Sequence, residues 1–215
     1  MAQSTFVRPS LTRVTTRYDR LARWYRFGEA AIGLPFGLRR KAVGRLGLTN
    51  GETVLEVGCG TGRNLQLLSG AVGADGRVIG IDASGGMLER AQHLVARRGF
   101  RNVRLVLGDA SEFALEDRLD AVLFSLSYSV LPDRQAVVSR AWEALRPGGR
   151  LVVMDAGLPT NRLGRLLAPF GEALATALPG DPYSRPWKEL AKLSHAVETE
   201  RFQLGTYFIC AAEKP

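Results

Sequence analysis

The feature that most constrains the fold is a regular alternation of short apolar runs with amphipathic stretches between residues 53 and 155. The apolar runs favour strands, and they lie at residues 53–57, 77–81, 103–107, 120–124 and 150–154. The stretches between them predict helices at 62–71, 85–98 and 134–145, the last with Asp133 as N-cap and 146–149 as a stop signal. Strands that alternate with helices indicate an α/β fold, with a mostly parallel sheet covered by helices on both faces.

The segments after this region have different patterns. Strand-like runs at 197–202 and 206–212 are separated by Leu204-Gly205, which predicts an antiparallel hairpin at a sheet edge. Residues 158–195 are Leu-rich and punctuated by Gly and Pro, and we expect them to form a cap insertion. The chain is thus predicted to consist of an N-terminal helical segment, 1–48, and a sheet-bearing domain, 49–215.

Composition excludes several classes of protein. No apolar run approaches the roughly 18 residues of a membrane span, and the first residues lack the pattern of a signal peptide. Cys59 and Cys210 are too few for a disulfide framework or a zinc site. We therefore expect a cytoplasmic protein without a bound metal.

A glycine-rich loop follows the first predicted strand. The strand ends in Glu56, and glycines follow at positions 58, 60 and 62 before the helix. Such a loop lets the backbone approach a nucleotide-like ligand closely. The third glycine of the dinucleotide fingerprint would lie at position 63, which is Arg63, and the Glu56 carboxylate would repel a pyrophosphate but suit an ammonium group.

Polar residues also follow the next strands. Asp82, Asp109 and Ser125 come at the ends of the second, third and fourth predicted strands. Ligands of open parallel sheets bind at the carboxyl ends of the strands, so we expect these residues to meet the glycine loop in one crevice. Asp82 lies about 20 residues after the loop, the usual distance for an acid that binds ribose hydroxyls.

Residues 50–155 resemble the class I S-adenosylmethionine-dependent methyltransferases. The resemblance lies in Glu56-Val-Gly-Cys-Gly-Thr-Gly62, Gly80-Ile-Asp82, Gly108-Asp-Ala110 and Leu145-Arg-Pro-Gly-Gly149. It implies a Rossmann-like, seven-stranded, mostly parallel sheet with a reversed last strand, and S-adenosylmethionine as cofactor. Carried over by position, it implies that Glu56 and the loop hold the methionine moiety, Asp82 the ribose, and Asp109 the adenine edge. The full predicted cofactor set is Glu56, Gly58, Cys59, Gly60, Thr61, Gly62, Asn64, Asp82, Ala83, Met87, Asp109, Ala110, Ser125 and Leu126.

A sulfonium methyl group is already activated, so such an enzyme chiefly aligns the acceptor with it. An amine or phenol acceptor can still need a proton removed. The candidate groups are Tyr18, Tyr25, Tyr128 and His195, and the alternative for each is a packed or surface position. Residues 124–130 lack the Asn/Asp-Pro-Pro-Tyr and Pro-Cys signatures of nucleic-acid base methylation, which leaves a lipid or another small molecule as acceptor.

The N-terminal segment holds the excess positive charge. Residues 1–50 contain ten Arg or Lys residues against Asp19 and Glu29, while the whole chain has a formal charge of +8. An apolar stripe at 11, 14, 18, 21 and 25 makes residues 11–26 a basic amphipathic helix. It can bind an anionic membrane surface through residues 1–45, cover the cleft as a lid, or pack as an ordinary first helix.

Residues 18–26 resemble the Tyr-Asp…Tyr-Asp opening of quinone-biosynthesis C-methyltransferases and of bacterial phospholipid and betaine-lipid N-methyltransferases, although Arg26 replaces the second Asp. The favoured acceptor is a phospholipid or betaine-lipid head-group amine, ahead of a quinone ring carbon. The alternatives are a soluble metabolite or natural product, and a non-catalytic cofactor-binding protein. A lipid acceptor places the protein in the cytoplasm, at the inner face of the membrane.

Overall fold

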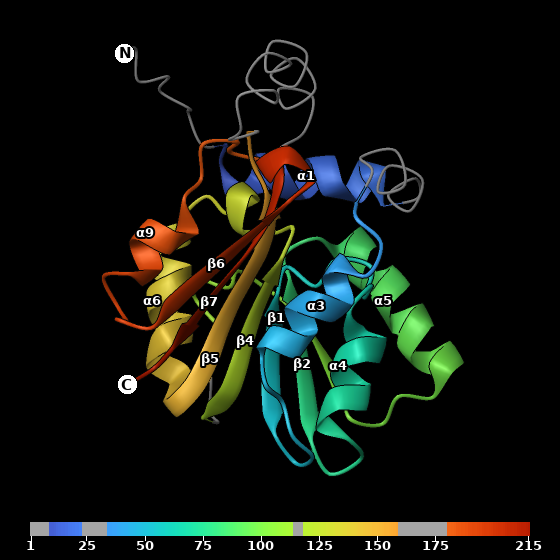
Figure 1. Cartoon of the computed structure of the whole chain (residues 1–215). Helices are drawn as coiled ribbons and strands as arrows, with labels where there is room; N and C mark the ends of the chain where they lie inside the picture. Colours follow the sequence, from blue (N-terminus) through green and yellow to red (C-terminus); the bar gives the residue numbers. More distant parts are fainter. Residues whose placement is uncertain (1–8, 23–33, 114–117, 159–179) are drawn as a thin grey trace.

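A computed structural model describes residues 9–22, 34–113, 118–158 and 180–215 (Figure 1). The helices are α1 (Leu11–Leu21), α3 (Leu38–Arg45), α4 (Leu65–Val72), α5 (Gly85–Arg98), α6 (Arg134–Ala144) and α9 (Pro186–Leu190). The strands are β1 (Thr53–Val57), β2 (Arg77–Asp82), β3 (Val103–Leu107), β4 (Leu119–Ser125), β5 (Leu145–Ala156), β6 (Val197–Phe202) and β7 (Tyr207–Glu213). Short 3₁₀ turns occur at η1 (Tyr128–Val130) and η2 (Gln203–Gly205).

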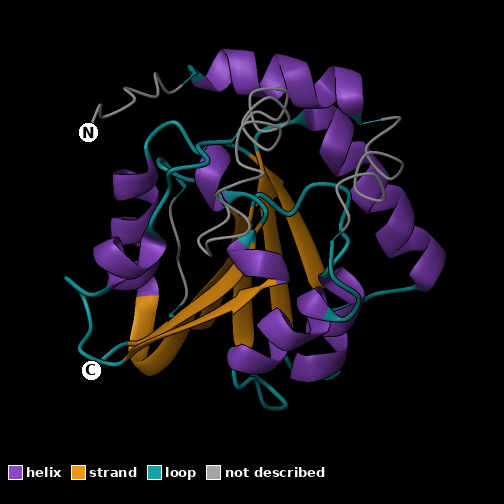
Figure 2. Ribbon diagram, turned by 45° about the horizontal axis from the view of Figure 1, so that its top comes forward, coloured by secondary structure: helices purple, strands orange, loops and turns teal. Residues whose placement is uncertain are grey.

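The strands form one sheet (Figure 2), and their order is β3-β2-β1-β4-β5-β7-β6. The pairs from β3 to β5 are parallel, whereas β7 is antiparallel to both β5 and β6. This topology confirms the predicted fold class and the terminal hairpin. Because β1 lies between β2 and β4, the strand order reverses there, and this is where open α/β sheets bind ligands.

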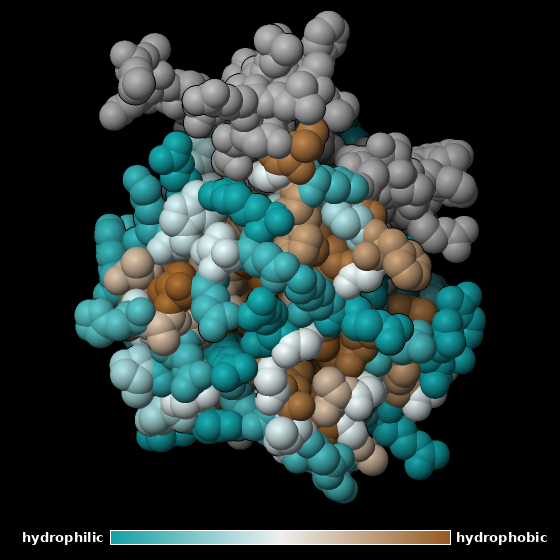
Figure 3. Space-filling model, in the orientation of Figure 1, coloured by the Kyte–Doolittle hydropathy of each residue, from teal (hydrophilic) through white to brown (hydrophobic). Residues whose placement is uncertain are grey.

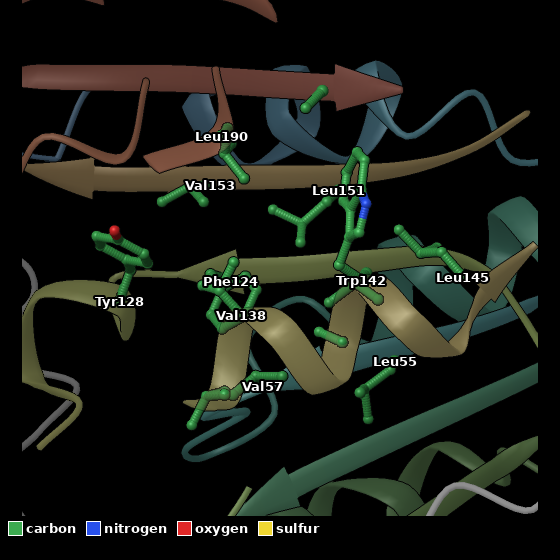
Figure 4. Packing of buried hydrophobic residues seen from close by; sticks show 14 of the residues in the cluster. Leu55, Val57, Phe124, Tyr128, Val138, Trp142, Leu145, Leu151, Val153 and Leu190 are labelled. Carbon is green, nitrogen blue, oxygen red and sulfur yellow. The ribbon is translucent and has the colours of Figure 1, made fainter. Parts of the chain in front are cut away.

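Helices cover both faces of the sheet. On one face α3, α4 and α5 bury Val43, Leu65 and Ala91 in a cluster with residues of β1, β2 and β4. On the other face α6 and α9 pack through Trp142 and Leu190, which Figure 4 shows beside the strands. Both faces are thus occupied by apolar packing, and the polar ligand-binding groups are left to the strand ends.

Side-chain caps mark the starts of α5 and α6. The Ser84 side chain caps α5 by accepting a hydrogen bond from the Met87 N–H (3.2 Å), and Asp133 caps α6 through the Ala136 N–H (3.0 Å), as predicted. The first predicted helix starts later than expected, at Leu65, because the glycines at 58, 60 and 62 have positive φ and form a loop instead.

Ion pairs fix α3 to the edge strand β6. Arg45 contacts Glu198 (2.6 Å) and Glu200 (3.0 Å), and Lys41 also pairs with Glu200. Part of the N-terminal positive charge is thus balanced within the protein. Figure 3, in the same orientation as Figure 1, shows hydrophilic residues over much of this side, with a smaller apolar area between them.

The predicted cap, 158–195, is described only in part, because residues 159–179 lie outside the described residues. Within the remainder, α9 packs on β6 and β7, where the Trp187 ring meets the Phe208 ring edge-on at 5.4 Å. Among the described helices, none combines the length and the hydrophobicity that crossing a bilayer requires.

Candidate functional site

A cleft of about 980 Å³, including its open mouth, lies at the carboxyl ends of β1, β2 and β4. Residues of the glycine loop line it, together with residues of segments 108–111, 125–127 and 130–133. Helix α1 completes the wall through Leu11, Val14 and Tyr18, and it runs across the top of the molecule in Figure 1. The sheet topology therefore brings the predicted polar groups together as expected.

Glu56 is the most strongly perturbed carboxyl group in the cleft. Its Oε1 accepts a hydrogen bond from Asn64 Nδ2 (2.5 Å), while its buried Oε2 has no hydrogen-bond partner among the described residues. Burial raises the pKa of Glu56 to about 7, although Asn64 and the Arg39 charge act in the opposite direction. A cationic group bound here would supply the missing partner, so the site fits the ammonium of a methionine moiety.

Arg39 extends this polar end of the cleft. It projects from α3, and its guanidinium donates to Asn64 Oδ1 (3.2 Å) and Ser125 Oγ (3.0 Å). A guanidinium near Glu56 makes the pair complementary to the carboxylate and ammonium of one amino acid. Arg39 was not predicted as a site residue, because from the sequence it is one of many arginines in the basic segment.

Asp82 lies at the end of β2, across the loop from Glu56. Its Oδ2 accepts from the Gly60 N–H (2.8 Å) and its Oδ1 from the Ser84 N–H (2.9 Å). Burial is the largest cause that raises the pKa of Asp82. Each carboxylate oxygen can accept more than one hydrogen bond, so Asp82 remains suited to ribose hydroxyls.

The loop conformation depends on the absence of side chains at Gly58 and Gly62. A Cβ at Gly58 (φ +68°) would lie 2.5 Å from Ser127 Cβ, and one at Gly62 (φ +81°) would lie 2.7 Å from Leu65 Cδ1. Ser127 is itself held by its hydroxyl, which donates to the Val57 carbonyl (2.6 Å). Gly62 is not among the residues that line the cleft, and the absence of a side chain there lets the loop pack against Leu65 of α4.

The other predicted cofactor residues all line the cleft. They are Glu56, Gly58, Cys59, Gly60, Thr61, Asn64, Asp82, Ala83, Met87, Asp109, Ala110, Ser125 and Leu126. Asp109 accepts from the Ser111 N–H (2.8 Å) and so shapes the loop at the end of β3. This geometry is consistent with the ligand contacts implied by the resemblance.

The three predicted catalytic residues that the structure describes, Tyr18, Tyr128 and His195, do not lie together. Tyr18 lines the cleft, but Tyr25 lies outside the described residues. Tyr128 is buried in the core beside Phe124 (Figure 4), where its hydroxyl donates to Glu189 Oε2 (2.5 Å). This position does not support a contact with the acceptor.

His195 is also remote from the cleft. It is exposed in the bend before β6. Strands β6 and β5 run in the same direction, because both are antiparallel to β7. Val197, at the start of β6, and Leu151, near the start of the regular part of β5, pair with the same residue of β7, Ala212. His195 therefore lies near the amino ends of the parallel strands, whereas the cleft lies at their carboxyl ends. The predicted catalytic role of His195 is not supported.

The described side chains of the apolar stripe, Leu11, Val14 and Tyr18, face the protein. Val14 is buried, and Leu11 and Tyr18 are partly buried against the cleft, whereas Arg13 and Arg20 are exposed. This arrangement favours the predicted lid over insertion of the stripe into a membrane. The cleft has further apolar residues that were not predicted from the sequence, namely Val130, Leu131, Pro132 and Val137.

Comparison with known proteins adds independent evidence. Residues 54–149 match a family model described as a methyltransferase domain. Demethylmenaquinone methyltransferases from several Staphylococcus aureus strains are 34% identical over 148 residues, which cover 68% of this chain and 58% of the relative. The chain thus spans less than two thirds of the length of these relatives.

Solved structures agree with the fold. A SAM-dependent methyltransferase from Aquifex aeolicus has a TM-score of 0.64 at 22% identity, covering 86% of this chain and 96% of that chain. Phosphoethanolamine N-methyltransferase 2 from Haemonchus contortus has a TM-score of 0.67 at 19% identity, covering 84% and 53%. At such identities the likeness concerns the fold alone.

Proposed function

Because the chain belongs to the class I S-adenosylmethionine-dependent methyltransferases, we propose that it transfers a methyl group to a ring carbon of a quinol-type acceptor. The observation that carries the choice of acceptor is that two kinds of residue line the cleft: a polar part, which includes Glu56 and Asp82, and an apolar part, which includes Leu131 and Val137. The name of the relatives, demethylmenaquinone methyltransferase, supports the same class of acceptor.

The polar part has the groups that the cofactor requires. Glu56 and Arg39 would hold the ammonium and carboxylate of the methionine moiety, and Asp82 would hold the ribose hydroxyls. Met87 and Asp109 would border the adenine. When bound, S-adenosylmethionine supplies an electrophilic methyl group on a positively charged sulfur.

The apolar part suits a flat, hydrophobic acceptor. Leu11 and Val14 of α1 line the cleft, and so do Leu131, Pro132 and Val137. Apolar walls with a few polar groups are typical of small-molecule sites and would exclude water around the ring. The chain's main contribution is then to hold the ring carbon in line with the methyl group.

Tyr18 is the polar group of α1 in this part of the cleft. We infer that its hydroxyl orients a phenolic oxygen of the acceptor. A ring carbon beside an ionised phenol is nucleophilic. The phenol proton passes to water, and after methylation the ring carbon also releases its proton to water, which restores the aromatic ring. A hydrogen bond to the oxygen would favour the ionised form.

A lipid head-group amine is the second candidate. The observation in its favour is that the Asp133 carboxylate lines the same cleft as Tyr18, and both could bind an ammonium group. The exposed arginines of α1 could contact anionic lipids by charge while the apolar stripe stays in the cleft, with about 1 kcal/mol per basic residue near an anionic surface.

The purified full chain should be assayed with labelled S-adenosylmethionine and separate acceptors. These are demethylmenaquinone reduced in the assay, phosphatidylethanolamine vesicles, and phosphoethanolamine. Label in the reduced quinone alone is the expected result. Label in phosphatidylethanolamine would favour the second candidate, and label only in phosphoethanolamine would exclude both lipid-associated acceptors.

A further inference from the structure

Helix α1 is attached to the start of α5 by one carboxylate. Asp19 Oδ1 accepts hydrogen bonds from Ser84 Oγ (2.5 Å) and from the Gly86 N–H (3.0 Å). These contacts join segments that are 65 and 67 residues apart in sequence. Tyr18, next to Asp19, enters the cleft. The position of the cleft wall therefore depends on this attachment.

Ser84 connects the attachment to the cofactor side of the cleft. Its backbone N–H donates to Asp82 Oδ1 (2.9 Å), while its hydroxyl donates to Asp19. Two carboxylates thus bind the same residue. Burial raises the pKa of Asp82, and the nearby Asp19 charge adds to that increase, as expected for two negative groups in proximity.

We propose that Asp19 is a positioning residue that couples the docking of α1 to ligand binding at Asp82. The proposal rests on the proposed function only in taking the ligand to be S-adenosylmethionine or its product. Hydrogen bonds from ligand hydroxyl groups to the Asp82 carboxylate would offset the electrostatic repulsion between Asp82 and Asp19. Ligand binding would therefore strengthen the docking of α1. By linkage, docked α1 would strengthen ligand binding by the same factor.

Adjacent glycines provide a matched pair of variants. A Cβ at Gly86 would lie 3.3 Å from Asp19 Oδ1 and 3.4 Å from Asp19 Cα, whereas a Cβ at Gly85 would meet nothing within 4 Å. Both residues lie in the first turn of α5 and neither has a positive φ. Gly86→Ala should therefore displace Asp19 by a few tenths of an ångström, and Gly85→Ala is its control.

The test is trypsin cleavage within α1, followed by mass spectrometry of the full chain with and without saturating S-adenosylhomocysteine. Cleavage of a helix requires local opening, so its rate reports docking. In wild type and Gly85→Ala, we expect the ligand to slow cleavage by about tenfold. Asp19→Ala should raise cleavage of the free protein by about threefold to tenfold, and Gly86→Ala should raise it by less.

Asp19→Asn separates charge from simple attachment. Its amide oxygen can still accept both hydrogen bonds, so the free protein should remain docked, but ligand protection should fall to about twofold because the repulsion is absent. Full protection in both Asp19→Ala and Asp19→Asn would overturn the proposal. If wild type does not bind S-adenosylhomocysteine in calorimetry, the proposed function fails instead.

Discussion

Replacing Glu56 by glutamine should strengthen the fold while weakening cofactor binding. Burial raises the pKa of Glu56 from 4.5 to about 7. Between these values the folded protein holds a proton that the unfolded chain has released, so stability falls as the pH rises. At about 1.4 kcal/mol per pKa unit, the loss is roughly 3 kcal/mol once the pH is above 7.

A glutamine at this position is neutral and can still accept the Asn64 hydrogen bond. At pH 8 the variant should therefore be more stable by about 3 kcal/mol, which for a chain of this size raises Tm by roughly 6–12 °C. At pH 5 the gain should shrink to about 1 kcal/mol, because wild-type Glu56 is then largely protonated in the folded state. Asp155, whose pKa burial raises to about 6, is present in both proteins and cancels in the comparison.

Ligand affinity should fall in the same variant, and calorimetric titration with S-adenosylhomocysteine measures this loss. Loss of a charged partner for the ligand ammonium corresponds to about 1.5–3 kcal/mol, or roughly 10- to 150-fold weaker binding at pH 8. Wild-type affinity should increase about tenfold from pH 6 to pH 8 as Glu56 ionises. A variant that is less stable than wild type at pH 8, yet binds the ligand equally well, would refute this reasoning.

Other substitutions test separate parts of the site. Asp82→Ala should weaken S-adenosylhomocysteine binding by about 10- to 150-fold, and unchanged affinity in calorimetry would remove Asp82 from the site. Tyr18→Phe should lower kcat with little change in cofactor affinity, whereas Tyr128→Phe should leave kcat unchanged and lower the free energy of unfolding in urea by about 1 kcal/mol. If α1 binds anionic membranes by charge, the protein should sediment with phosphatidylglycerol vesicles, and less of it should do so with added salt or in the double variant Arg13→Ala/Arg20→Ala. Absence of sedimentation at low salt would contradict binding by charge.

The elements that could be predicted depend on local signals. Runs of apolar residues indicated the strands, and Asp133 indicated the start of α6, because a capping side chain bonds within one turn of itself. The strand-end acids were also predictable, since a parallel sheet brings the carboxyl ends of its strands to one edge. These rules need no knowledge of distant contacts.

The residues that were missed or misplaced depend on distant contacts. Tyr128 follows a strand end, as a site residue would, but its hydroxyl partner Glu189 is 61 residues away. Arg39 reaches the cleft through partners 25 and 86 residues along the chain. No local pattern distinguishes such a residue from the exposed arginines around it.

The N-terminal helix shows how far a hydrophobic stripe can be interpreted. The periodicity identifies which face of α1 leaves water, but a membrane, a partner or the same chain could cover that face. In the structure Val14 and Tyr18 cover the cleft, while Asp19 bonds to the start of α5 from the same helix. Because Val14 and Tyr18 already have this partner, we expect a membrane contact of the described part of α1 to use its exposed arginines, so that it is sensitive to salt and insensitive to these two residues.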